Sequence, residues 1–279
     1  MSAIPENGRP MRAIPPHRGT QAAGTDASPH PRRPVALITG ASSGIGAAVA
    51  DRLSAGGRWD LLLNGRDVER LSDVAARTGG SALPWDLASE EGCRSLAEEA
   101  LAVGGRVDAL VAAAGLGWAG TYTDMTPALV NRLVKVNVCA VMHLVSELLP
   151  PMLTRGSGRL VVLGSVAGRF GVRGEAAYAA TKGALIPFVQ SLRYELQGTG
   201  VRLCLVMPGP VDTPFFARRG TPYTRSRPRP VPAGRVAEAV EEALSGKRHE
   251  ITVPRWMEVP ARLQGVAPHL FHRLATRFG

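Results

Sequence analysis

From Val35 onward, short apolar runs alternate with longer segments of helical periodicity, and this alternation most restricts the possible fold. The apolar runs have no polar face, which is typical of parallel strands buried on both sides. The predicted strands are residues 35–39, 61–64, 82–85, 109–113, 160–163, 201–207 and 251–253. The predicted helices are residues 47–55, 68–77, 90–103, 128–152, 176–197 and 235–244. We therefore predict one α/β domain, a doubly wound parallel sheet with helices on both faces.

The composition fits a globular protein, with 45% hydrophobic and 20% charged residues in a chain of 279. The three cysteines are widely spaced and the six histidines show no ligand spacing, so we predict neither a disulfide framework nor a metal site. The chain has no long apolar run, and its N-terminus lacks an apolar signal core. We therefore expect no transmembrane helix, no secretory signal and a cytoplasmic location.

The formal net charge of +10 raises the question of nucleic-acid binding. The excess of basic residues lies at the two ends of the chain, whereas residues 35–212 carry equal numbers of acidic and basic side chains. A duplex-binding domain would carry its basic stripe on the folded face. We therefore expect no nucleic-acid partner.

Both ends of the chain differ from the central part. Residues 1–33 are rich in proline and arginine and show little apolar periodicity, so we predict a disordered tail before the domain of residues 34–254. Residues 255–279 are predicted to form a basic amphipathic extension. Its apolar members are Leu263, Val266, Leu270, Phe271, Leu274 and Phe278. Such a segment packs on its own domain or a partner subunit, and contact with an anionic membrane surface is the alternative.

The first predicted strand runs into Thr39-Gly40-Ala41-Ser42-Ser43-Gly44-Ile45-Gly46, and a helical segment follows. Glycine lets the backbone approach a pyrophosphate closely, and N–H groups at a helix N-terminus point at phosphates. A strand, a glycine turn and a helix in this order predict a dinucleotide site. The residues assigned to it are Gly40, Ser42, Ser43, Gly44, Ile45 and Gly46.

The second predicted strand ends at Gly65-Arg66-Asp67. An arginine here suits the 2′-phosphate of NADP(H), whereas an acid would accept a hydrogen bond from the ribose 2′-hydroxyl of NAD. Arg66 therefore favours NADP(H). NAD(H) stays open as the alternative, because the carboxylate of Asp67 could take the ribose contact.

Tyr178 and Lys182 are four residues apart in a helical segment, so they share one face. A nearby cation favours the phenolate, so we expect Lys182 to lower the pKa of Tyr178 from its usual ~10. Such a phenol suits general acid/base work on a carbonyl or alcohol. Ser165 follows a buried strand, where it could donate to an oxygen that develops negative charge. A surface Tyr–Lys pair and an ordinary turn serine are the alternatives.

Over roughly residues 35–254 the chain resembles the short-chain dehydrogenase/reductase family in its single-domain form. The resemblance rests on residues 39–46, Asp86-Leu87, Asn137, Ser165, Tyr178-x-x-x-Lys182 and Pro208-Gly209, in the family's order. It implies a Rossmann-like fold and an NADP(H)-dependent oxidoreductase that interconverts a ketone or aldehyde and an alcohol. The same fold could instead sense NADP without catalysis, or the basic C-terminal end could make this a peripheral membrane or scaffold protein.

The resemblance also implies a role for each site residue. Tyr178 would be the general acid/base, Lys182 would lower its pKa and bind the nicotinamide ribose, and Ser165 would polarise the substrate carbonyl. Asn137 would hold a water molecule of a proton relay. The other cofactor contacts would be Asp86 and Leu87 at the adenine, Ala113, Ala114 and Gly115 at the adenosine ribose, and Pro208, Gly209, Val211 and Thr213 at the nicotinamide.

The chain departs from the family at Ala112-Ala113-Ala114-Gly115, where Asn-Asn-Ala-Gly is usual. We expect this strand to lose hydrogen bonds to its neighbours. The family's substrate lid would be residues 213–234, whose five arginines could recruit an anionic or carrier-linked substrate, with a solvated loop as the alternative. The family further implies a homodimer or homotetramer built through helices 128–152 and 176–197.

Overall fold

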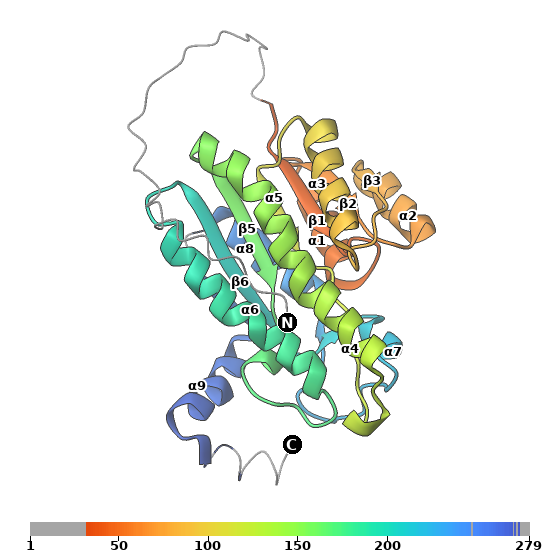
Figure 1. The fold of residues 1–279 in the computed structure, drawn as a ribbon, viewed down its shortest axis with the longest axis vertical. Helices are drawn as coiled ribbons and strands as arrows, with labels where there is room; N and C mark the ends of the chain where they lie inside the picture. The colour runs from red at the N-terminus through yellow and green to blue at the C-terminus, as the bar shows by residue number, and fades with distance from the viewer. Residues whose placement is uncertain (1–31, 247, 270, 272, 274–279) are drawn as a thin grey trace, which may run out of the picture.

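The computed structural model describes residues 32–246, 248–269, 271 and 273, and its main body is one parallel sheet between two helical layers (Figure 1). The strands of this sheet are β1 (Val35–Thr39), β2 (Asp60–Asn64), β3 (Ser81–Leu83), β4 (Ala109–Ala112), β5 (Gly158–Leu163), β6 (Val201–Pro208) and β9 (Glu250–Val253). Their order is β3-β2-β1-β4-β5-β6-β9, and all neighbouring pairs are parallel. The predicted doubly wound, Rossmann-like α/β fold is confirmed.

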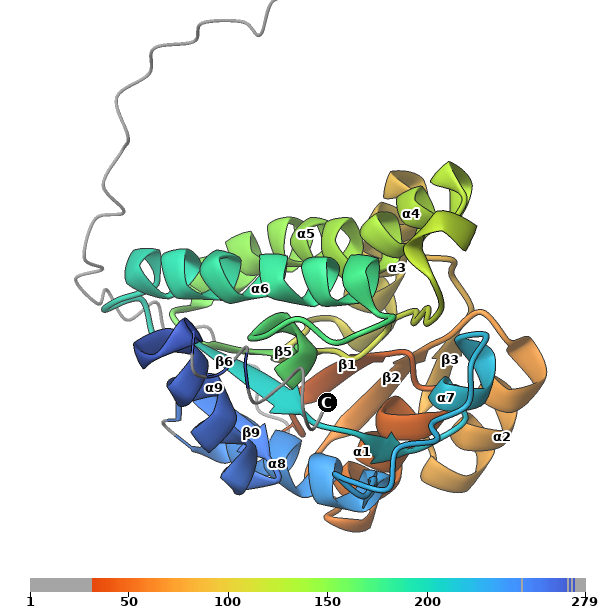
Figure 2. The ribbon, with the colours of Figure 1, turned by 90° about the horizontal axis from the view of Figure 1, so that it is seen from below.

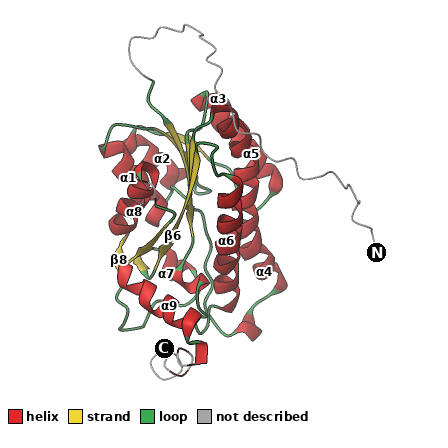
Figure 3. Cartoon of the chain, turned by 90° about the vertical axis from the view of Figure 1, so that its left-hand side faces the viewer, coloured by secondary structure: helices red, strands yellow, loops and turns green. Residues whose placement is uncertain are grey.

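Helices cover both faces of the sheet (Figures 2 and 3). One layer consists of α1 (Gly44–Ala55), α2 (Val68–Thr78) and α8 (Ala233–Ser245). The other consists of α3 (Glu90–Gly104), α5 (Ala140–Arg155) and α6 (Ala176–Glu195), with α4 (Pro127–Val134) leading into α5. The two layers explain the continuous apolar strands. Leu37 belongs to the core under α3, α5 and α6, while its neighbour Ile38 belongs to the core under α1, α2 and α8.

The predicted helix 128–152 is interrupted by a π-helical segment, Lys135–Cys139, between α4 and α5. The whole helical stretch Pro127–Arg155 is long and apolar enough to span a membrane by length and composition alone. In this fold the apolar side of the stretch packs against the sheet, where Leu144, Leu148 and Met152 are buried in the core. We therefore interpret it as a core helix.

The chain after β6 contains short elements that the sequence pattern did not predict. They are β7 (Val211–Asp212), α7 (Phe215–Arg218), β8 (Val231–Pro232) and the 3-10 turn η4 (Arg255–Met257), whereas α9 (Glu258–Val266) begins the predicted amphipathic extension. The strands β7 and β8 pair with each other at the two ends of the predicted lid segment. Backbone bonds also tie the lid to the chain after β4, since Ala119 N–H donates to the carbonyl of Arg219. The lid segment is thus anchored at its base and at Arg219.

The described part of the C-terminal extension packs partly on its own domain. Met257 is buried, and the ring of Phe271 is buried 5.4 Å from that of Phe170. Trp256 and Val266 are exposed on the same extension. Residues 1–31 of the predicted tail (residues 1–33) and the predicted apolar positions Leu270, Leu274 and Phe278 lie outside the described residues.

A buried threonine ties the end of β4 to β1. Thr39 Oγ1, at the end of β1, accepts hydrogen bonds from the N–H groups of Ala113 (3.1 Å) and Ala114 (3.0 Å). Thr39 is only 1% exposed, so water cannot take over these bonds. The end of β4 therefore remains tied to β1 without amide side chains.

We predict that Thr39→Val lowers the free energy of unfolding by about 2 kcal/mol, because the isosteric side chain leaves buried N–H groups without their acceptor. Urea denaturation of the variant and the wild type measures this difference. Thr39→Ser keeps the oxygen and serves as the control. A valine variant as stable as the wild type would show that these bonds contribute nothing.

Candidate active site

A cleft of about 590 Å³ opens at the carboxyl ends of β1, β4, β5 and β6. All strands of a parallel sheet end at the same edge, so loops that are far apart in sequence meet there. The predicted site residues that line the cleft are Gly40, Ser42, Ser43, Gly44, Ile45, Gly46, Arg66, Asp86, Leu87, Ala113, Ala114, Gly115, Ser165, Tyr178, Lys182, Pro208, Gly209, Val211 and Thr213. Asn137 is the predicted site residue that does not line it.

The glycine turn between β1 and α1 forms one wall of the cleft, and close backbone packing requires its glycines. Gly40 has a φ of +69°, and a Cβ on it would lie 2.8 Å from the Cα of Ala114. A Cβ on Gly46 would lie 2.3 Å from the carbonyl oxygen of Gly40. Helix α1 starts here with Ser43 as N-cap, and the Ser43 side chain makes no capping bond. The turn therefore has the shape and the free N–H groups that fit a dinucleotide pyrophosphate.

The loop after β2 brings charged side chains to the neighbouring end of the cleft. Arg66 Nε lies 4.0 Å from Asp86 Oδ1, and both side chains are about half exposed. Asp67 is used differently, because its Oδ1 accepts the backbone N–H of Arg70 at 3.0 Å and its carboxylate pairs with the Arg70 side chain. The bond to this N–H lowers the pKa of Asp67 below its usual range. Asp67 thus caps α2, and Arg66 is the residue of this loop whose charge is available to a ligand.

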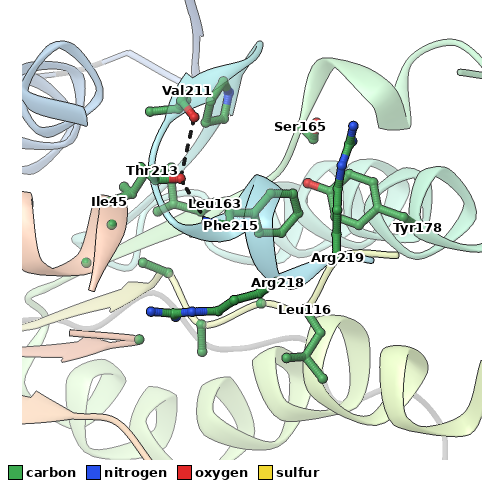
Figure 4. Close-up of a pocket in the computed structure, with 18 of the residues that line it drawn as sticks. Ile45, Leu116, Leu163, Ser165, Tyr178, Val211, Thr213, Phe215, Arg218 and Arg219 are labelled. Carbon is green, nitrogen blue, oxygen red and sulfur yellow. Dashed lines mark hydrogen bonds between the residues drawn. The ribbon is translucent and has the colours of Figure 1, made fainter. Parts of the chain in front are cut away.

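Ser165 and Tyr178 meet in the half of the cleft farther from the glycine turn, as Figure 4 shows. Ser165 is the first residue after Gly164 at the end of β5, and its Oγ accepts the N–H of Ala167 at 3.1 Å. Tyr178 lies in the first turn of α6, where the neighbouring Ser165 lowers the pKa of its phenol. The tyrosine ring packs against Phe215 of α7, with 5.5 Å between ring centroids. The predicted pair of hydroxyls is therefore assembled.

The predicted lowering of the Tyr178 pKa by Lys182 is not found in the chain by itself. Burial raises the pKa of Tyr178 to about 12; Ser165 and Arg219 act against this rise, and Glu175 adds to it. Lys182 is 5% exposed and its Nζ donates to the carbonyl of Leu163 at 2.8 Å, while burial lowers its own pKa to about 8. The prediction was wrong because it counted the attraction of the cation and omitted the desolvation of both groups.

Asn137 lies behind the cleft wall, in the π-helical segment, and is fully buried. Its side-chain amide holds three protein groups. Nδ2 donates to the carbonyl of Leu116 (2.9 Å) and to Thr181 Oγ1 (3.0 Å), and Oδ1 accepts the N–H of Leu116 (2.7 Å). The side chain therefore joins the chain after β4 to α6. Its predicted contact with a water molecule stays a prediction.

A buried ion pair that the sequence pattern did not predict lies beside Tyr178. Arg219 of the lid segment pairs with Glu175, which precedes α6, and the two side chains are 8% and 14% exposed. The guanidinium also lies 4.7 Å from the ring centroid of Phe216. The sequence does contain one signal for Glu175. It precedes Tyr178 by three residues, and residues at this spacing lie close together on a helix. Nothing in the sequence pattern distinguished Arg219 from the other lid arginines.

The family is established by comparison with known proteins. The sequence model of the short chain dehydrogenases matches residues 34–223. An uncharacterized oxidoreductase of Staphylococcus epidermidis is 32% identical over 225 residues, which cover 78% of this chain and 96% of that protein. The chain therefore belongs to the short-chain dehydrogenase/reductase family.

Solved structures of the family share the fold. A short-chain dehydrogenase from Sphingobium yanoikuyae in complex with NADPH has a TM-score of 0.74 and 30% identity, and the match covers 85% of this chain and 95% of that one. A family member from Burkholderia phymatum in complex with NAD has a TM-score of 0.77 and 25% identity, with the same coverage. Similar chains thus bind either nicotinamide cofactor.

We predict that wild-type protein gains about 2 kcal/mol of stability relative to Lys182→Met between pH 7 and pH 9.5. The pKa of Lys182 is about 8 in the folded chain and 10.5 in the unfolded chain, so the unfolded chain binds the extra proton in this window. Stability therefore rises as the pH rises. Urea denaturation at both pH values tests this, and a difference that does not change with pH would contradict a buried, titrating Lys182.

Proposed function

We propose that the protein is an NADP(H)-dependent oxidoreductase that interconverts a ketone or aldehyde and the corresponding alcohol. The observation that carries the proposal is that Ser165 and Tyr178 lie together inside the cleft that the glycine turn borders. An NADP sensor would need only the glycine turn that binds the dinucleotide, and a scaffold protein would need only the basic ends of the chain. Neither would need two hydroxyl groups placed together at the other end of the same cleft.

The bound nicotinamide would supply or accept the hydride at the carbonyl carbon. The chain supplies the groups at the carbonyl oxygen. In reduction, Ser165 donates a hydrogen bond to the oxygen while negative charge develops on it, and Tyr178 transfers its phenolic proton to the same oxygen. The hydrogen bond from Lys182 Nζ to the carbonyl of Leu163 joins α6 to the end of β5 beside the site. Oxidation of the alcohol runs the same proton path in reverse.

The protonation state of Tyr178 supports a role as proton donor. Burial raises its pKa to about 12, so the hydroxyl carries its proton at neutral pH. Reduction of a carbonyl uses this protonated form directly, whereas oxidation of an alcohol requires the phenolate.

The surroundings of Tyr178 support a substrate with an apolar body. The lining of the cleft includes the apolar side chains of Leu116, Phe170, Val172, Phe215, Phe216 and Met257, of which Phe215 packs on the ring of Tyr178. The lid cation that points toward Tyr178, Arg219, is already paired with Glu175. A carbonyl compound with an aliphatic or aromatic substituent would bury that substituent on these side chains, with a gain of ~25 cal/mol for each Å² removed from water.

Arg66 supports the preference for NADP(H) over NAD(H). Its guanidinium is available at the adenosine end of the cleft, while the competing carboxylate of Asp67 is engaged by α2.

Residues 213–234 are proposed to form the substrate lid, because Phe215 and Arg219 of this segment border Ser165 and Tyr178. A homodimer or homotetramer and a cytoplasmic location remain our proposals for assembly and compartment.

We predict that Tyr178→Phe retains NADPH binding and lowers turnover by about a hundredfold to ten-thousandfold, since it removes the proton donor and little else. The loss of turnover is measured by following NADPH absorbance with a panel of aliphatic and aromatic ketones and aldehydes. The wild type and the variant are compared on the same compounds. NADPH binding is measured separately by fluorescence titration. Turnover that survives in the variant would refute the mechanism. A variant that has lost turnover but still supports the biological role of the protein would favour an NADP sensor.

We predict that Arg66→Ala weakens NADPH binding about tenfold or more and leaves NADH binding nearly unchanged, because only NADPH carries the 2′-phosphate. Titration of both cofactors into the variant gives the two dissociation constants. Arg262→Ala, an exposed arginine of α9, controls for the loss of one charge. Equal weakening of both cofactors would exclude Arg66 as the 2′-phosphate contact.

A further inference from the structure

Two adjacent arginines at the end of α7 reach into opposite halves of the cleft (Figure 4). Arg219 points toward Tyr178 and is paired with Glu175. Arg218 points the other way, toward the glycine turn. Because α7 belongs to the lid segment, the Arg218 side chain bridges the lid and the dinucleotide wall.

The contact of Arg218 lies at the first turn of α1. Its Nη1 donates to Ser43 Oγ at 2.9 Å, and Ser43 is the N-cap residue whose side chain leaves the helix N–H groups uncapped. This bond joins residues 175 positions apart in the chain. Thr213 approaches the same turn, because a Cβ on Gly44 would lie 3.4 Å from its side chain. The start of the lid segment therefore rests directly on the glycine turn.

Arg218 is also close to other cations. Arg66, Arg70 and Arg218 all line this end of the cleft, although they come from three different elements. Burial lowers the pKa of Arg218, the charges of Arg70 and Arg66 lower it further, and Asp67 acts in the opposite direction. Asp67 is itself paired with Arg70. Arg66 and Arg218 thus repel each other, and an anion bound between them would relieve the repulsion.

We propose that Arg218 is a lid-borne contact for the 2′-phosphate of NADP(H), so that binding of this cofactor fastens the lid over the cleft. This proposal rests on the proposed function. A guanidinium forms paired hydrogen bonds to phosphate oxygens, and Arg218 is held by its lid position at the end of the cleft where Arg66 is available. NAD(H) lacks this phosphate and would leave Arg218 with its serine contact alone.

The first experiment measures binding of two probes by calorimetry. Adenosine 2′,5′-bisphosphate carries the 2′-phosphate, and adenosine 5′-diphosphate carries the pyrophosphate without it. We expect Arg218→Ala to weaken the bisphosphate about tenfold and to leave the diphosphate unchanged, with partial recovery in Arg218→Lys. Arg229→Ala, an exposed lid arginine outside the cleft lining, is the matched control.

The second experiment follows the lid itself in the full-length protein. Trypsin can cleave after Arg225, which is exposed in the lid and is followed by Ser226, whereas Arg227 and Arg229 precede prolines. We expect saturating NADPH to slow this cleavage more than saturating NADH in the wild type and in Arg229→Ala. In Arg218→Ala the two cofactors should protect equally.

The outcomes separate this proposal from the function on which it rests. If the wild type bound neither NADPH nor the bisphosphate, the proposed function would fail. If Arg66→Ala weakened the bisphosphate while Arg218→Ala behaved like Arg229→Ala, only the role of Arg218 would be wrong. Weakening of both probes by Arg218→Ala would move the contact to the pyrophosphate and overturn the 2′-phosphate assignment.

Discussion

The parallel pairing of β1, β4, β5 and β6 is the constraint on which the cleft depends. Each strand is buried on both faces and must bond its backbone to both neighbours, so the strands cannot slip without exposing apolar side chains or losing hydrogen bonds. The register brings the ends of all four strands to one edge of the sheet. The glycine turn, Gly115, Ser165 and the chain after Pro208 meet there as a consequence.

Buried polar side chains hold this edge together where strand pairing ends. Thr39 binds the chain after β4, Asn137 joins that chain to α6, and Lys182 binds the last carbonyl of β5. Each of these groups would be unfavourable in the core without its partner. The same burial sets the chemistry, since it raises the pKa of Tyr178 and lowers that of Lys182.

The lid segment divides its charge between the two halves of the cleft. Arg219 is paired with Glu175 beside Tyr178, whose ring packs on Phe215. Arg218 adds its charge at the dinucleotide end. The sequence pattern does not distinguish the five lid arginines, whereas the end of α7 directs Arg218 and Arg219 into opposite halves of the cleft.

The sequence by itself determined the order of strands and helices, the glycine turn and the positions of Ser165, Tyr178 and Lys182, because periodicity and chain order are local properties. Strand β1 was predicted at its observed bounds, and the other strands of the main sheet within a few residues. Only the tertiary structure decided the pairing of Arg219 with Glu175, the reach of Arg218 to Ser43 and the direction of the Tyr178 pKa shift. The two contacts depend on which side chains face each other across the cleft, and the pKa shift depends on the exclusion of water by burial. The order of residues in the sequence specifies neither directly.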